Sequence, residues 1–309
     1  MESMGIKGKY EKRKVLIIGA SGFLGKELYK VFKTDQENYE TYGTYSKNSV
    51  RELKRLDVTD LENVKIIFRE IKPNIVIITV ALTNVECCEV YKEEAYKINV
   101  KGLKNIAELC KVYDSKAVYV STDYVFDGVN GPYSEDNIPE PINYYGQTKL
   151  EGEKIISAML EDYIIARTTV VYGWDLESKN FIMQLIKTLG ENKTMKVPVD
   201  QVSSPTYCPN LAQMIKESCD KNLIGIYNMA GNEVMDRYTF ARKAATIFGL
   251  NPELIAPVET RALGQVAKRP LNAGLKVDKI SVPLINKPVG VTEGLTKVQS
   301  LYMKYMVKV

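Results

Sequence analysis

The amino-acid sequence predicts an α/β fold, a doubly wound parallel sheet with a smaller C-terminal lobe. Two observations support this prediction. Short apolar runs alternate with amphipathic stretches up to about residue 174, as in parallel strands joined by right-handed helical crossovers. Beyond that point prolines mark the loops between shorter elements. We expect a flexible lead-in (1–13), a sheet domain (14–174), and a region (175–309) that is mainly a substrate-binding lobe, with the chain returning to the sheet domain.

The elements of the sheet domain follow one another in a regular order. Residues 14–33, KVLIIGASGFLGKELYKVFK, combine a strand, a glycine turn and a helix. The continuous apolar run VLII is typical of a parallel strand covered on both faces. Further strands are expected near 40–45, 51–58, 74–81, 115–122 and 163–173, and helices over 59–71, over 93–113 and from Tyr145 onward.

Composition restricts the class of protein. A net charge of +4 over 309 residues is not gathered into a basic block, so nothing favours nucleic acid or membrane surfaces as partners. No apolar run approaches the length of a membrane span, and the N-terminal segment lacks the apolar stretch of a signal peptide. Five cysteines without a C-x-x-C pair argue against a disulfide framework, so we expect a cytoplasmic location.

The chain contains no histidine. This absence excludes Ser-His-Asp and Cys-His nucleophilic machinery and every zinc site that needs imidazole. We predict no metal site. Acid–base chemistry near neutral pH must therefore use a carboxylate, lysine, tyrosine or cysteine.

The glycine turn G-A-S-G-F-L-G lies between the first strand and the first helix. Glycines at this spacing let the backbone approach a pyrophosphate at the helix N-terminus, which predicts a Rossmann-type dinucleotide site. A tight turn without a ligand is the alternative. The residues of this predicted site are Gly19, Ser21, Gly22, Phe23, Leu24 and Gly25.

The segment after the second predicted strand bears on the choice of cofactor. An acidic residue there would hold the adenine ribose hydroxyls of NAD. The sequence instead reads GTYSKN, with Ser46, Lys47 and, further on, Arg51. These side chains would receive a 2′-phosphate, so NADPH is favoured, with NADH as the second choice. The alternative is that Lys47 and Arg51 belong to a solvated face.

Tyr145 and Lys149 form one of three Tyr-x-x-x-Lys pairs in the chain, so the spacing alone proves little. Only this pair begins a helix after a strand ending in VYVSTDYVF, at the ligand-facing edge of the sheet. The ammonium of Lys149 would lower the pKa of Tyr145 and bind the nicotinamide ribose. Thr122 would hydrogen-bond a substrate carbonyl oxygen, with Ser121 as a weaker alternative. These groups could reduce a carbonyl with a cofactor hydride.

At this point the sequence resembles the extended short-chain dehydrogenase/reductases and, within them, the dTDP-4-dehydrorhamnose reductase family. The resemblance runs from Lys14 to about Leu295. Its most specific part is STDYVFDG followed by YYGQTKLEGE. The other matching segments are GASGFLG, LDVTD, KPNIVIITVALTNVECCE, INV, RTTVVYG, DQVSSPTY and KRPLNAGL.

The resemblance implies roles for individual residues. Thr122, Tyr145 and Lys149 would be catalytic, with Thr122 and Asp123 near the substrate. The implied cofactor contacts are Gly22, Phe23 and Leu24 at the phosphates, Asp57 and Val58 at the adenine, and Ala81, Leu82, Thr83 and the supporting Asn99 beside the cofactor. Two positions depart from the family: Val170 replaces a tryptophan that packs on the sugar, and Asn210 replaces an aspartate.

The expected activity is therefore reduction of the 4-keto group of a nucleotide-linked 6-deoxysugar, with dTDP-4-dehydrorhamnose as first candidate, by a protein that could form a homodimer. A non-catalytic alternative is a dinucleotide-binding regulatory subunit, because the β subunit of methionine adenosyltransferase is similar to the same family. A third alternative is an epimerase or dehydratase of the same fold. Some relatives bind magnesium at a dimer interface, but no such ligands are identified in this sequence.

Overall fold

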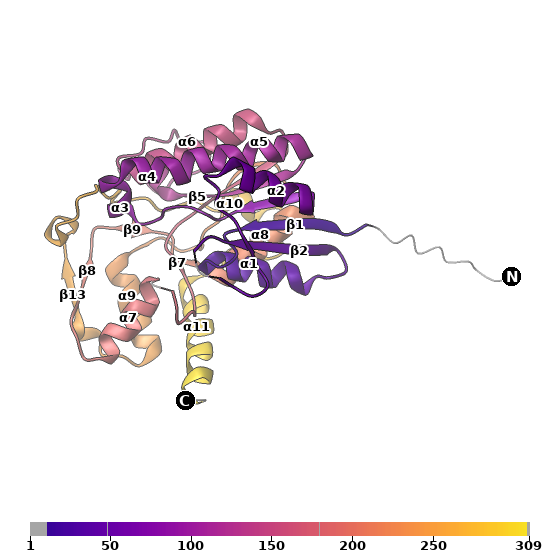
Figure 1. Ribbon diagram of the computed structural model, residues 1–309. Coiled ribbons are helices and arrows are strands. Elements are labelled where there is room, and N and C mark those ends of the chain that lie inside the picture. The colour runs from indigo at the N-terminus through magenta and orange to yellow at the C-terminus, as the bar shows by residue number, and fades with distance from the viewer. Residues whose placement is uncertain (1–10, 48, 179, 308–309) are drawn as a thin grey trace.

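Seven parallel strands form the centre of the computed structural model, which describes residues 11–47, 49–178 and 180–307 (Figure 1). The predicted doubly wound α/β fold is thereby confirmed. The strands lie in the order β11 (Gly225–Asn228), β6 (Tyr163–Thr168), β5 (Lys116–Thr122), β4 (Ile75–Ile78), β1 (Arg13–Ile18), β2 (Tyr39–Tyr45) and β3 (Lys54–Arg55).

The apolar runs of the sequence form the interior strands of this sheet. Every residue of β4 is buried, as are the last four residues of β1. Successive side chains of a strand point to opposite faces, so Leu16 and Ile18 enter one core while Val15 and Ile17 enter the other. Between β1 and β4 the strand order reverses, and open α/β sheets bind ligands at such a point.

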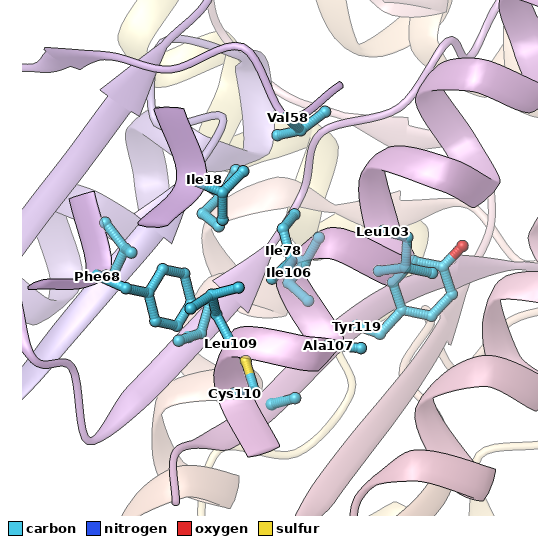
Figure 2. Close-up of a cluster of buried hydrophobic side chains, with 14 of the residues drawn as sticks. Ile18, Val58, Phe68, Ile78, Leu103, Ile106, Ala107, Leu109, Cys110 and Tyr119 are labelled. Atoms are coloured by element: carbon cyan, nitrogen blue, oxygen red, sulfur yellow. The ribbon is translucent and has the colours of Figure 1, made fainter. Parts of the chain in front are cut away.

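Helices cover both faces of the sheet. Figure 2 shows the core on one face, where Phe68, Ile106 and Leu109 lie near Ile78 and Leu103 lies beside Tyr119. The helices on this side are α2 (Leu61–Ile71), α4 (Lys92–Tyr96), the π-helical turn η1 (Lys97–Gly102), α5 (Leu103–Tyr113) and α6 (Tyr144–Met159), with the short α3 (Val85–Val90) beside α6. The other face is covered by α1 (Phe23–Thr34), α8 (Cys208–Asp220) and α10 (Asp278–Ser281).

A second body lies beside the carboxyl edge of the sheet (Figure 1). Its core brings Tyr172, Leu185, Phe240 and Leu295 together. Its helices are α7 (Phe181–Gly190), α9 (Arg237–Phe248), α11 (Val291–Met306) and the short η3 (Pro252–Leu254) and η4 (Thr260–Leu263). Its strand pairs are β7 (Val171–Tyr172) with β10 (Thr206–Tyr207), β9 (Val202–Ser203) with β12 (Met235–Asp236), and β8 (Met195–Pro198) with β13 (Ile255–Val258).

The local structure differs from the sequence prediction in several segments. The strand expected over 163–173 ends at Thr168 with β6, and Val171 begins β7, which pairs with β10 in a separate sheet. The strand expected over 51–58 is reduced to β3, because Asp57 turns to accept hydrogen bonds from Thr59 and Asp60 caps α2. The helix expected over 93–113 is continuous but contains the π-helical turn η1, a feature that often occurs at functional sites.

The division into domains stays a prediction. Both α8 and β11 come after residue 174 and belong to the sheet layers, so the chain returns to the sheet within the region 175–309. At the other end, residues 1–10 of the expected lead-in lie outside the described residues, and Arg13 already begins β1.

Candidate active site

The carboxyl ends of β1, β4, β5 and β6 open onto a cavity of about 600 Å³. It lies where the strand order reverses. The predicted site residues that line it are Gly19, Ser21, Gly22, Phe23, Leu24, Gly25, Ser46, Val58, Ala81, Thr83, Thr122, Asp123, Tyr145, Lys149 and Val170. The predicted residues that do not line it are Lys47, Asp57, Leu82 and Asn99.

The glycine loop has the shape that a pyrophosphate requires. Gly19 has φ +92°, a conformation that favours glycine, and a Cβ at Gly25 would lie 2.1 Å from the Gly19 carbonyl oxygen. Gly22 precedes α1 without a capping side chain, so no side chain competes for the first N–H groups of the helix. The residues present therefore fit the phosphates of a dinucleotide.

Residues of β2 and of the turn after β3 also line the cavity. Thr44 and Tyr45 line it in addition to the predicted Ser46 and Val58. The Thr44 hydroxyl accepts a hydrogen bond from the Gly19 amide at 3.2 Å, so β2 also holds the glycine loop. The Asp57 carboxylate instead accepts hydrogen bonds from Thr59, which hold the pKa of Asp57 below its usual value.

Asn99 does not line the cavity but holds the segment after β4. Its Oδ1 accepts a hydrogen bond from the Leu82 amide at 2.7 Å, and its Nδ2 donates to the Leu82 carbonyl at 3.1 Å. The same Nδ2 donates to Thr148 Oγ1 at 3.0 Å. Asn99 therefore ties the loop containing Ala81 and Thr83 to helix α6, which carries Tyr145.

Helix α6 begins at the cavity, and its start is firmly fixed. The Asn143 side chain caps the helix, accepting from the Gly146 amide at 2.8 Å, and donates to the Lys268 carbonyl at 2.9 Å. A Cβ at Gly146 would lie 2.1 Å from the Tyr124 carbonyl oxygen, so only glycine allows this approach to the loop after β5. As a result Tyr145 and Lys149 face the end of β5, where Thr122 lies.

Burial dominates the electrostatics of this group. It raises the pKa of Tyr145, and a hydrogen bond with Thr122 only partly opposes this effect. Burial also lowers the pKa of Lys149 to about 7, against the smaller opposing effect of Glu153. The Lys149 ammonium donates to the Val120 carbonyl at 2.7 Å. The expected net lowering of the Tyr145 pKa is therefore not found, because desolvation outweighs any effect of the lysine charge.

Comparison with known proteins identifies the family of the chain. Residues 13–302 match the family described as RmlD substrate binding domain, which covers most of the chain. The chain belongs to this family.

The relatives of this chain include subunits named methionine adenosyltransferase 2 subunit beta and enzymes named dTDP-4-dehydrorhamnose reductase. A methionine adenosyltransferase 2 subunit beta of Rattus norvegicus is 30% identical over 279 residues, which cover 87% of this chain and 81% of that protein. A dTDP-4-dehydrorhamnose reductase of Aggregatibacter actinomycetemcomitans is 31% identical over 279 residues, which cover 86% of this chain and 92% of that protein. The solved structure of a dTDP-4-dehydrorhamnose reductase from Bacillus anthracis in complex with NADP has a TM-score of 0.84 at 30% identity, covering 97% of this chain and 100% of that one.

Asp123 and Val170 form another part of the cavity wall in this RmlD family member. The Asp123 carboxylate accepts hydrogen bonds from the hydroxyls of Thr122 at 3.0 Å and Thr169 at 2.7 Å, while burial raises its pKa to about 6. Val170 has φ +40°, an outlier for a β-branched residue. Such strain is common at ligand sites, so the valine that replaces the expected tryptophan lies on a constrained wall.

Asn210, the second departure from the family pattern, lies away from this wall. Its Nδ2 donates to the Lys287 carbonyl at 3.0 Å, and its Oδ1 accepts from the Val289 amide at 3.1 Å. A carboxylate could not make the first of these bonds. The asparagine therefore fixes the segment that leads into α11.

Arg237, the first residue of α9, also lines the cavity, and the sequence did not reveal it. No spacing of residues around MDRYTF indicates a site, since the arginine reaches the cavity only through the packing of the second body. In the part of the chain that the structure describes, no cluster of acidic and cysteine side chains could hold a metal ion. Nor is any described helix long and apolar enough to cross a membrane.

Proposed function

We propose that this protein reduces the 4-keto group of a nucleotide-linked 6-deoxysugar with NADPH, and that its first candidate reaction is dTDP-4-dehydrorhamnose to dTDP-L-rhamnose. One observation carries the proposal: Thr122, Tyr145 and Lys149 line the same cavity as the glycine loop. Membership of the RmlD family and likeness to the Bacillus anthracis reductase over 97% of the chain support it.

Tyr145 is proposed as the proton donor. Because burial raises its pKa, the phenol keeps its proton at neutral pH, as reduction requires. Thr122, in hydrogen-bonding reach of Tyr145, would hold the substrate carbonyl oxygen beside that proton. A bound nicotinamide supplies the hydride to the carbonyl carbon. The electron pair of the C=O bond then moves to the oxygen, which takes the proton from Tyr145 and becomes the hydroxyl group.

Lys149 is proposed to bind the ribose hydroxyls of the cofactor. Its Nζ also donates to the Val120 carbonyl, so its position is set by the end of β5. Burial lowers its pKa to about 7, so it loses its charge at a lower pH than an exposed lysine does. When Tyr145 gives up its proton, a charged Lys149 would stabilise the phenolate.

The decisive experiment compares Tyr145→Phe with Tyr144→Phe. Tyr144 is the preceding residue of α6 but does not line the cavity, so it is a matched control. Carbonyl-dependent NADPH oxidation is measured with dTDP-4-dehydro-6-deoxy-L-mannose and its UDP and GDP counterparts. Loss of a general acid typically costs about 10²–10⁴-fold in rate, and we expect such a loss for Tyr145→Phe alone. An unchanged rate in that variant would remove Tyr145 from the mechanism.

A regulatory function is the second candidate, because methionine adenosyltransferase 2 subunit beta proteins are among the relatives. On this alternative the chain would bind a dinucleotide and a synthetase partner without turnover. Co-purification with a methionine adenosyltransferase, together with no turnover of any nucleotide-sugar ketone, would favour it. An epimerase or dehydratase would turn over its substrate without net consumption of NADPH.

We further propose a preference for NADPH over NADH, a cytoplasmic location and a homodimer. Ser46 lines the cavity, Lys47 and Arg51 follow it in the sequence with exposed side chains, and the structure of the Bacillus anthracis relative is in complex with NADP. All five cysteines are free thiols, which suits a reducing compartment. Parallel titrations with NADPH and NADH test the preference, and sedimentation of the purified chain tests the dimer.

A further inference from the structure

Arg237 is a cation of the cavity to which the proposed catalytic mechanism assigns no task. Of the described residues that line the cavity, those with charged side chains are Asp123, Lys149 and Arg237. Arg237 is the one that comes from the C-terminal body, at the start of α9. Its backbone amide donates to the Gln201 carbonyl at 2.9 Å, which fixes the base of the side chain.

The guanidinium group of Arg237 has an unused donor. Its Nε is buried, yet it makes no hydrogen bond within the described structure. The guanidinium carbon lies 5.1 Å from the centre of the Phe181 ring, so packing against an aromatic face holds the group in place. Buried polar groups nearly always have a hydrogen-bond partner, so an unpaired Nε in a cavity wall points to a ligand.

Arg237 lines the same cavity as Asp123 and Tyr124, the residues that follow Thr122. Burial raises the pKa of Asp123 and Tyr124, and the nearby charge of Arg237 opposes this effect in both groups. Asp123 directly follows Thr122, and its carboxylate is already bonded to the hydroxyls of Thr122 and Thr169. The glycine loop, which would receive the cofactor phosphates, is a separate part of the wall formed by the start of α1.

We propose that Arg237 binds the diphosphate of the nucleotide-sugar substrate. The edge of a guanidinium that carries Nε matches two phosphate oxygens, and a charged pair of this kind is strong in a water-poor site. The sugar would then lie between Arg237 and Thr122, with its keto group toward Tyr145. The identity of the ligand as a nucleotide sugar rests on the proposed function; the anion-binding role rests on the cavity and the unpaired donor.

Binding of dTDP and thymidine to the wild-type chain, in the presence of NADPH, tests this role. Arg237→Gln should weaken dTDP binding at least tenfold and leave thymidine and NADPH binding unchanged. Arg237→Lys keeps the positive charge but lacks the paired N–H donors of the guanidinium, so its affinity for dTDP should fall at least threefold. Arg242→Gln is the matched control, since Arg242 lies on the same helix but faces Glu253, and it should bind dTDP as the wild type does.

Each outcome decides the proposal. It is overturned if both Arg237 variants bind dTDP like the wild type, or if the wild type binds dTDP, UDP and GDP no better than the corresponding nucleosides. An equal loss for dTDP and thymidine would also overturn it. A selective loss of diphosphate binding supports it even when the wild type reduces no nucleotide-sugar ketone. In that case the proposed reductase activity fails while the anion site stands.

Discussion

Replacing Glu153 by glutamine tests the buried ion pair that joins helix α6 to the sheet. Glu153 lies on α6, two turns beyond Tyr145, and Arg167 lies on β6. The arginine donates from Nε to Oε1 at 3.0 Å and from Nη2 to Oε2 at 2.7 Å, and the two side chains are only 2% and 4% exposed. Ser121 adds a third bond to Oε1 at 2.5 Å.

The loss of unfolding free energy in Glu153→Gln follows from the charge of Arg167, which would stay buried without its partner. Removing one partner of a buried pair costs about 3–5 kcal/mol, because the other charge stays desolvated. Glutamine keeps one acceptor oxygen for Arg167, so we expect about 3 kcal/mol, the lower end of that range. At about 2 °C per kcal/mol for a chain of this size, the unfolding midpoint should fall by about 6 °C.

Urea and thermal unfolding of the purified variants measure this cost. Glu153→Met combined with Arg167→Met is the control, because it removes both charges and should recover much of the loss. A cost below about 1 kcal/mol for Glu153→Gln would refute the argument that the charge of Arg167 is left uncompensated. A double variant as unstable as the single one would show that packing, and not charge, holds α6 to β6.

The same substitution has a kinetic readout. The Glu153 carboxylate raises the pKa of Lys149 against the larger effect of burial, so its removal should lower that pKa further. Since Lys149 is charged below its pKa, the basic limb of kcat/KM should move to lower pH in Glu153→Gln. If the pH profile of kcat/KM stays unchanged while the stability falls, Glu153 supports the fold but does not tune the pKa of Lys149.

Three further predictions follow from single contacts. Gly25→Ala should weaken NADPH binding at least tenfold in a fluorescence titration, because its Cβ would lie 2.1 Å from the Gly19 carbonyl oxygen. The wild-type kcat/KM should decline above about pH 7 in a pH–rate profile, as Lys149 loses its proton. In Glu217, bonds from the Ile285 and Asn286 amides outweigh burial and lower the pKa to about 2. The ionised Glu217 side chain should stabilise the fold by about 3 kcal/mol above pH 4.5, and this contribution should be lost as the pH falls toward 2. In urea unfolding, the wild type should therefore be more stable than Glu217→Gln above pH 4.5, and the difference should shrink near pH 2.

Much of the fold and the centre of the site could be predicted from local sequence. The runs VLII and IVII are strands because they contain no polar residue to place in water, and both became interior strands. The glycine loop could be predicted because its backbone conformation needs glycine at Gly19 and Gly25. Tyr145 and Lys149 could be paired because four residues make about one helical turn.

What the sequence did not reveal depends on tertiary packing. Arg237 lies 88 or more residues beyond the other charged residues of the cavity, and only the fold of the second body brings it there. The direction of the Tyr145 pKa shift was wrong because neighbouring charge can be inferred from spacing, whereas desolvation cannot. Lys47 was assigned by its position after the second predicted strand and Asp57 by the family resemblance. Neither lines the cavity, and the Asp57 carboxylate accepts a hydrogen bond from the Thr59 hydroxyl instead.

Helix α6 offers an argument about which of the two candidate functions the chain performs. Gly146 and Gly152 bring it close to the sheet: a Cβ would meet the Tyr124 carbonyl oxygen at 2.1 Å and the Tyr119 hydroxyl at 2.4 Å. This approach seats Tyr145 against Thr122 and Lys149 against Val120. A module that only binds a dinucleotide needs the glycine loop and the cavity, but it has no use for a protonated phenol beside a hydroxyl at a strand end. The arrangement therefore favours the reductase, and the rate of Tyr145→Phe is the measurement on which the two functions differ.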